Sequence, residues 1–532
     1  MSHASSTPVK SSRQTWLPMV IIAMGQAQMS LNTGALPISI GGIVAEFNTA
    51  PTTVGTMIVA HSIAVSGFTM LAAKLGQKFG SLNVYRAATA LLLVSMVMMT
   101  FSSSVTMLLA AQIIAGLASA GIIPTLVVLI ASNYKGRQLA TAIGVLGAVQ
   151  AMAAVIAFFL AGVVGSHFGW RYAFGLVIPF SAVALLMSRR LAQVPKADGV
   201  KIDGVGALLA VTAVILIGAG VNYFNDWGVM LASAWAPFSV LGVSPALVMV
   251  IAGVVGLQLF VAWTQRRLLR AQTPLLALEV INAAPERAAV VSLMMITALG
   301  SALTFLVPLY IQIVQGRTSF DTAVAMIPHQ LSVLAAAVIV LRLYDSLTPR
   351  QITRYAFVLI FVALVLLGLV MKNEWHDLLV ILGLVLFGLG QGALVTQLFN
   401  VLVTSAPLKF VGDVGSLRGT ARNLAAGIGT AVAGALVVAL LTVNVERSLV
   451  DNPTIPSDLI KQVDLDRATF VSNDRLKDVM AGTTATQMQV DEAVRINTDA
   501  RLRALKLSFL LLAGVALMAI VPTGRLPDRP AS

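Results

Sequence analysis

The 532-residue chain contains no cysteine and few charged residues. Without cysteine it has no disulfides, no thiolate nucleophile and no cysteine metal site. Asp, Glu, Lys and Arg make up 11% of the residues, whereas soluble domains carry about 25%. So few charges cannot cover a water-facing surface, and we therefore expect the chain to face lipid.

Catalytic and cofactor motifs are also missing. The five histidines are scattered, and we expect no metal site. No Gly-rich loop ends in Lys-Ser or Lys-Thr, which argues against ATP binding. No His-Glu motif or Ser/His/Asp arrangement lies at membrane depth. We expect neither an enzyme nor a bound cofactor.

Long apolar runs are abundant. Hydrophobic residues make up 58% of the chain and the mean hydropathy is +0.89. About 20 apolar residues cross the hydrocarbon core of a bilayer as a helix. Fourteen runs qualify as transmembrane helices, and they are Trp16–Pro37, Thr52–Ala72, Ala87–Phe101, Met107–Ala131, Leu139–Val164, Tyr172–Met187, Gly206–Asn222, Leu241–Thr264, Ala288–Ile313, Ala323–Leu341, Ala356–Met371, Leu378–Val403, Ala421–Leu441 and Leu505–Val521.

The net charge of +13 lies mainly in alternate loops. Examples are the groups around Lys74, Arg189 and Arg266, while the short opposite loops hold few Lys or Arg. Cytoplasmic loops carry such an excess. We therefore expect a multi-pass protein of the cytoplasmic (inner) membrane, with both termini cytoplasmic and lipid rather than nucleic acid as partner.

The loop from Asn444 to about Ala500 is long, mixed in charge and predicted to lie on the outer side. It is too polar to enter lipid. One reading is a solvated loop with short helices, and the other is a docking surface for a periplasmic partner protein.

Polar side chains within the spans are the candidate substrate-binding residues, because an ionised group at the membrane centre costs about 2.5–3.5 kcal/mol and is usually functional. No Asp or Glu lies well inside a predicted span. A histidine could carry a proton, and Arg422 could anchor an anionic substrate. The alternative is hydrogen bonding between helices, or an arginine reaching headgroups. The candidates are Gln28, Asn32, His61, Gln112, Gln150, Gln312, Gln391, Gln397, Asn400 and Arg422.

Several stretches resemble the major facilitator superfamily, and within it the fourteen-span drug:proton antiporter branch of the multidrug efflux type. These stretches are Ala35-Leu36-Pro37, His167-Phe168-Gly169-Trp170-Arg171, Pro308-Leu309-Tyr310-Ile311-Gln312 and Arg422-Asn423-Leu424-Ala425-Ala426-Gly427-Ile428-Gly429. The resemblance covers most of the chain.

The resemblance implies an all-α membrane protein with two six-helix bundles and two inserted helices. The first bundle would be residues 16–190, the basic linker with the two inserted spans would be 191–270, and the second bundle would be 271–522. The second bundle would contain the outer loop at 444–503, and residues 1–15 and 523–532 would be cytoplasmic tails. The resemblance also implies export of a small amphipathic or drug-like solute by alternating access.

Three positions that usually hold a charged residue in this branch are glutamine here. They are Gln28 in the first span, Gln77 in the following loop and Gln112 in the fourth span. The proton-coupling motifs are therefore degenerate. This departure motivates a second hypothesis, a transporter-like sensor or assembly subunit that does not transport.

Overall fold

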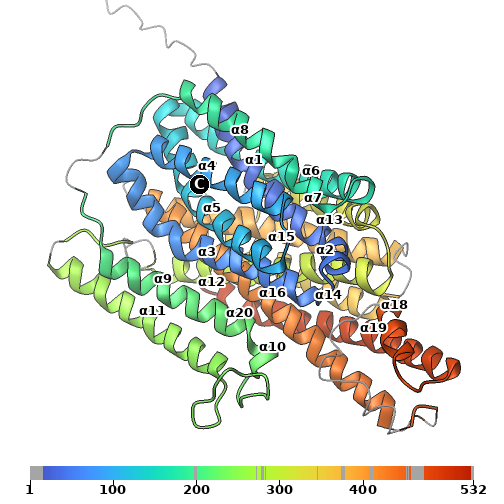
Figure 1. Ribbon diagram of the computed structural model, residues 1–532. Helices are drawn as coiled ribbons and strands as arrows, with labels where there is room; N and C mark the ends of the chain where they lie inside the picture. The colour runs from blue at the N-terminus through green and yellow to red at the C-terminus, as the bar shows by residue number, and fades with distance from the viewer. Residues whose placement is uncertain are drawn as a thin grey trace, which may run out of the picture.

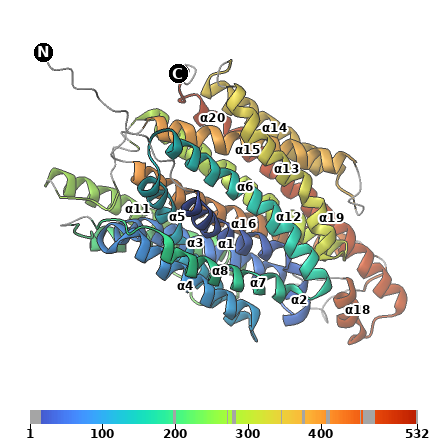
Figure 2. The ribbon, with the colours of Figure 1, turned by 90° about the horizontal axis from the view of Figure 1, so that it is seen from above.

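The computed structural model describes residues 16–196, 200–270, 272–276, 281, 283–343, 346–372, 378–405, 411–450, 452, 454–456 and 473–528. It is built from long helices that run roughly along one direction (Figure 1). Both termini lie at one end of these helices, and α18 (Asn473–Ala481) lies at the other (Figure 2). We call the two ends the termini side and the loop side.

The first helices of the chain form the N-terminal group. They are α1 (Leu17–Ile38), α2 (Ile40–Phe47), α3 (Pro51–Phe79), α4 (Ser81–Thr100), α5 (Val105–Asn133), α6 (Gly136–His167), α7 (Trp170–Gly175), α8 (Val177–Met187) and the 3₁₀ turn η1 (Ser188–Arg190). Three helices follow, α9 (Gly204–Asn222), α10 (Phe224–Trp227) and α11 (Pro245–Leu269).

The remaining helices form the C-terminal group. They are α12 (Ala284–Leu309), the π-helical turn η3 (Tyr310–Val314), α13 (Ser319–Leu343), α14 (Pro349–Val370), α15 (Leu378–Ser405), α16 (Val411–Val450), α18, α19 (Gln487–Met518) and α20 (Ile520–Thr523).

Thirteen helices in the described part of the chain are long and apolar enough to cross a membrane. Every predicted span corresponds to helix, and the sixth is formed by α7 and α8 with a break at Leu176. The helix α1 matches the first predicted span but is not among the thirteen. Its interior carries Gln26, Gln28 and Asn32, which lower its hydropathy.

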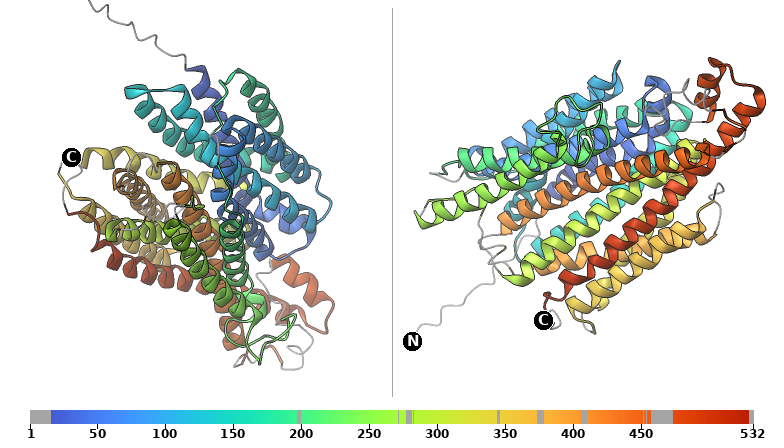
Figure 3. Two further views of the ribbon diagram at one scale, coloured as in Figure 1. Left: turned by 90° about the vertical axis from the view of Figure 1, so that its left-hand side faces the viewer. Right: turned by 90° about the horizontal axis from the view of Figure 1, so that it is seen from below.

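The two groups lie side by side when the molecule is seen along its helices (Figure 3, left). They meet where α3 packs on α16 and where α6 packs on α13. The helices α9 and α11 pack on each other, and α9 also contacts α3 and α16. The interface between the groups is therefore formed chiefly by two pairs of long helices.

Glycines let neighbouring helices approach closely within each group. A Cβ atom on Gly116 of α5 would lie 2.5 Å from the carbonyl oxygen of His61 in α3, and one on Gly388 of α15 would lie 2.5 Å from that of His329 in α13. Close backbone approach through small residues drives helix association in membranes. The two groups therefore use the same device at corresponding helix pairs.

Two helices extend well beyond the predicted spans. Helix α16 begins at Val411 and continues to Val450, whereas the prediction placed its apolar run at 421–441. Helix α19 begins at Gln487, so much of the predicted 444–503 outer loop is helical. Polar residues end an apolar run without ending a helix, because a helix can continue outside the lipid.

The loop-side ends of α16 and α19 enclose a small apolar cluster of Ile455, Met480 and Ile496. Arg501 of α19, fully buried, fixes this region to the rest of the C-terminal group. Its guanidinium donates to the side-chain oxygen of Asn473 and to the carbonyl oxygen of Ile313 in η3, the latter at 3.3 Å.

The close approach of α5 and α3 is testable. Gly116→Ala places a methyl group against a backbone oxygen that cannot turn away, so we expect a loss of about 1–3 kcal/mol in stability. Thermal unfolding of the purified protein in detergent measures it. Gly147→Ala in α6 is the matched control, because no atom lies within 4 Å of that Cβ position. Equal melting temperatures for both variants would contradict this packing.

Candidate functional site

Three of the predicted site residues are buried inside the N-terminal group. Asn32 of α1 and Gln112 of α5 exchange amide hydrogen bonds of 3.4 and 3.2 Å. Gln28 of α1 donates to the hydroxyl of Thr89 in α4 at 3.5 Å. All three glutamine and asparagine side chains are at most 1% exposed. These residues are brought together as neutral pairs between helices of one group.

The two membrane histidines occupy corresponding positions in the two groups. His61 of α3 is buried, and its Nδ1 atom has no hydrogen-bond partner among the residues that the structure describes. His329 of α13 is also buried, and its Nε2 atom lies 3.0 Å from Oε1 of Gln391 in α15. Gln391 is thus bonded within the C-terminal group.

Gln397 and Asn400 lie farther along α15. Gln397 is fully buried, and within the described part of the chain neither its amide nitrogen nor its oxygen has a hydrogen-bond partner. Asn400 is half-buried.

Gln312 closes the interface between the groups on the loop side. Its Oε1 atom accepts a 2.7 Å hydrogen bond from the backbone N–H of Gly41 in α2, and its Nε2 atom donates to the carbonyl of Pro37 in α1 at 3.2 Å. Both partners belong to the N-terminal group, while Gln312 lies in η3. One side chain therefore links the groups through two main-chain contacts.

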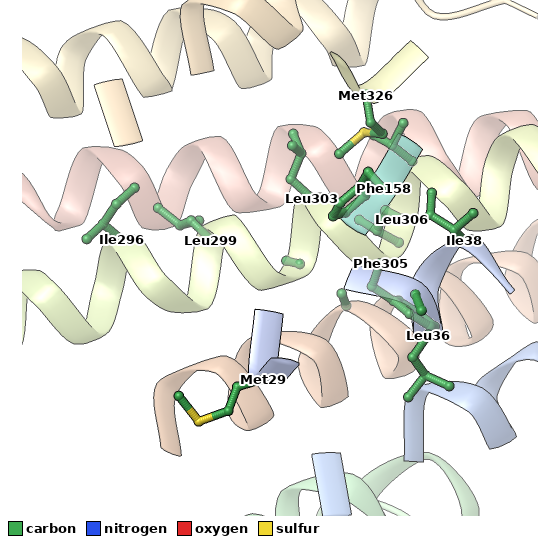
Figure 4. Packing of buried hydrophobic residues seen from close by; sticks show 14 of the residues in the cluster. Met29, Leu36, Ile38, Phe158, Ile296, Leu299, Leu303, Phe305, Leu306 and Met326 are labelled. Atoms are coloured by element: carbon green, nitrogen blue, oxygen red, sulfur yellow. The ribbon is translucent and has the colours of Figure 1, made fainter. Parts of the chain in front are cut away.

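An apolar cluster extends this closure into the membrane (Figure 4). It combines Leu36 of α1 and Phe158 of α6 with residues of the C-terminal group, such as Leu306 of α12 and Met326 of α13. Each of these side chains is at most 5% exposed. The loop side is sealed by packing as well as by hydrogen bonds.

A different contact joins the groups midway through the membrane. The hydrogen-bond pattern assigns the amide oxygen of Gln150 in α6 to the side facing Arg422 in α16, where it accepts from Nη2 at 2.9 Å and also from Nη1. Two predicted site residues, 272 positions apart in the sequence, are thereby brought together across the interface.

The depth of Arg422 follows from the register of α16 against α3. A Cβ atom on Gly419 would lie 3.2 Å from Cγ2 of Thr69, and one on Gly427 would lie 3.2 Å from Cβ of Ser62. Arg422 therefore lies opposite the middle of α3, which spans Pro51–Phe79. Arg422 lies within the helix and not in its first turn, because α16 starts eleven residues earlier.

Arg418 is a site residue that the sequence did not indicate. It falls between the predicted spans at residues 378–403 and 421–441, but it lies on α16 one turn before Arg422. Its Cζ atom lies 4.0 Å from the centroid of the Phe399 ring in α15. The sequence did contain a signal for it. Arg418 lies four residues before Arg422, and residues four apart share a helix face if the helix begins before the apolar run.

On the termini side, an ion pair connects the groups. Lys74 of α3 lies 3.7 Å from Asp413 in the first turn of α16, with both side chains 16% exposed. Contacts between the groups thus occur at three depths, on the loop side, in the middle and on the termini side.

No group of three or more His, Asp or Glu side chains is arranged to hold a metal ion among the residues that the structure describes. At mid-depth the interface brings together the amide of Gln150 and the guanidinium of Arg422, and Arg418, one turn before Arg422, lies against the ring of Phe399. Such groups can bind and orient a solute.

Comparison with solved structures supports the fold. The chain resembles a bacterial homologue of the human lysosomal transporter Spinster in an inward-facing, unoccupied conformation, with a TM-score of 0.62, 11% identity and coverage of 97% of this chain and 98% of that one. It also resembles an autoinhibited POT family peptide transporter, with a TM-score of 0.61, 16% identity and coverage of 97% and 99%.

Curated relatives are similar over most of their length. The riboflavin transporter RibZ of Clostridioides difficile is 22% identical over 81% of this chain and 90% of its own. The tetracenomycin C resistance and export protein of Streptomyces glaucescens is 23% identical over 82% and 78%. The multidrug efflux pump LfrA of Mycolicibacterium smegmatis is 22% identical over 81% and 83%.

The family model described as Major Facilitator Superfamily matches residues 22–430. This match covers most of the chain and includes the N-terminal group, the C-terminal group as far as the middle of α16, and the contacts that Gln312, Asp413 and Arg422 make between them. The family and the structural neighbours are transporters rather than enzymes. The chain therefore belongs to the major facilitator superfamily and is a multi-pass membrane transporter.

Proposed function

We propose that the protein exports a small amphipathic or drug-like solute across the inner membrane by alternating access. The observation that carries this proposal is the hydrogen bond between Gln150 and Arg422, which joins the two groups at mid-membrane depth. Rocking of two helix bundles around a central site opens it to one side at a time. A polar contact at the centre, with further contacts between the groups on the loop side and on the termini side, suits this motion.

The loop-side and termini-side contacts differ in strength. Gln312 and the apolar cluster form an extensive closure on the loop side. The termini side has the Lys74–Asp413 pair at 3.7 Å, and partly exposed ion pairs contribute only about 0–1 kcal/mol. The termini side is the easier one to open, and in our proposed orientation it faces the cytoplasm, from which an exporter takes its substrate.

We also propose the finer assignment to the fourteen-span multidrug branch. The helix α1 is then a span despite its polar residues, because Gln28 and Asn32 are bonded to other helices rather than exposed to lipid. The helices α9 and α11 are then the two inserted spans. Efflux relatives such as LfrA support this assignment by similarity.

In this proposal coupling does not use a carboxylate in the first span. Gln28 and Gln112, at positions that the branch usually charges, are bonded to neutral Thr89 and Asn32. Neither amide changes charge between pH 5 and 8. Transport is then driven by the concentration gradient of the solute itself, or it is coupled to protons through another residue.

Transport itself is tested in proteoliposomes with ethidium, phenylnaphthylamine and anilinonaphthalene sulfonate as fluorescent solutes. We expect at least one to move faster than through liposomes without protein, and the Gln28→Glu variant to gain a dependence on a pH gradient. Rates equal to those of empty liposomes for all three solutes would favour the sensor or assembly-subunit hypothesis over transport.

The closure on the loop side is tested with a disulfide, since the chain has no native cysteine. A Cβ atom on Gly41 would lie 3.3 Å from Cβ of Gln312, close to the 3.5–4.5 Å separation typical of disulfides. We expect the double variant Gly41→Cys/Gln312→Cys to lose most of its transport on oxidation and to recover it on reduction.

The matched control places both cysteines within the N-terminal group. Gly175 and Thr100 are suitable, because a Cβ atom on Gly175 would lie 3.6 Å from Cγ2 of Thr100. Oxidation of Gly175→Cys/Thr100→Cys should leave transport unchanged. If the oxidised Gly41/Gln312 variant transports as fast as this control, the loop side does not have to open.

A further inference from the structure

Two positive charges lie on one face of α16 inside the membrane. Arg418 and Arg422 are separated by one helical turn, so their side chains are neighbours. The contacts of Gly419 with Thr69 and of Gly427 with Ser62 place this turn opposite the middle of α3. Two cations so close together repel each other, and at this depth the repulsion is only weakly screened.

Several other arginines of the molecule have a partner of opposite charge. Arg171 pairs with Glu46, Arg267 with Asp203 and Arg350 with Asp528. In the described part of the chain, no carboxylate pairs with Arg418 or Arg422. The Nε atom of Arg418 is buried without a hydrogen-bond partner.

The side chains around the two arginines are uncharged, and they contact both guanidinium groups. Arg422 donates to Gln150, and the Cζ atom of Arg418 lies 4.0 Å from the centroid of the Phe399 ring. A cation over an aromatic ring is attracted by the electron density of its face.

We propose that Arg418 and Arg422 bind the anionic group of an amphipathic organic solute, a carboxylate, sulfonate or phosphate carried on an apolar or aromatic body. This proposal rests on the transport function and specifies its substrate class. The planar fork of a guanidinium matches such oxyanions with paired hydrogen bonds. Phe399 lies where the apolar body of the same solute would contact it.

The anion also acts on the contact between the groups. Arg422 uses its Nη atoms to hold Gln150 of the opposite group. An oxyanion is a stronger acceptor than a neutral amide, so it displaces Gln150 from Arg422. Binding of the solute then loosens the mid-membrane link and favours separation of the two groups.

A pair of matched fluorescent probes tests the proposal on the purified protein in detergent. Anilinonaphthalene sulfonate and phenylnaphthylamine share an aromatic body, and only the first is an anion. We expect the wild-type protein to bind the sulfonate at least about tenfold more tightly than the neutral amine, and Arg418→Gln and Arg422→Gln to lose that preference. Arg266→Gln, at an exposed position on α11, is the control that should keep it.

A second variant does not depend on removing an arginine. Gln150→Glu places a carboxylate beside Arg422 with almost no change in shape. We expect its melting temperature to rise, because the charge gains a partner, and its affinity for the sulfonate to fall about tenfold. Increased stability together with lost affinity shows that the arginine was available to an anion.

The proposal is overturned if the wild-type protein binds both probes equally or neither, or if the three variants keep the preference for the sulfonate. Failure of the transport function gives a different pattern. In that case the sulfonate binds with the expected dependence on both arginines, but no solute moves in proteoliposomes.

Discussion

Lipid offers no hydrogen-bond partner, so every polar group inside this molecule has to be satisfied by the protein itself. The helix arrangement reflects this constraint. Asn32 and Gln112 exchange hydrogen bonds within the N-terminal group, and His329 meets Gln391 within the C-terminal group. Among the described residues, several buried groups depart from it, including the amide of Gln397 and the Nε atom of Arg418. Of these two, Arg418 carries a charge, and because an unpaired buried charge is costlier than an unpaired amide, it points to a bound anion.

The same constraint divides the polar contacts into two kinds. Pairs inside one group, such as Gln28 with Thr89, hold helices that move together and need not change during a transport cycle. Contacts between groups, made by Gln312 on the loop side and Arg422 at mid-depth, have to break when the groups separate. The role of a polar contact therefore depends less on which side chains form it than on whether the two helices belong to the same group.

Hydropathy predicted the middle of each span and failed at the ends. Asp413 and Arg418 lower the hydropathy before residue 421, yet α16 begins at Val411 because its first turns pack on α3. The predicted site was incomplete for the same reason, because Arg418 precedes the predicted span at residues 421–441. The sequence indicated that Gln150 and Arg422 were polar residues in spans. It could not indicate that they meet, because that depends on which helices are neighbours.

Arg501 has a mechanical consequence. By joining Asn473 to Ile313 it ties the start of α18 and the middle of α19 to η3, the turn that follows α12. Helix α19 begins fourteen residues before this anchor, so its tip projects about 20 Å beyond it. A lever of that length converts a small rotation of the C-terminal group into a displacement of several ångströms at the tip. In the proposed rocking motion, the projecting helices would therefore move farther than the parts of the C-terminal group that lie near its centre.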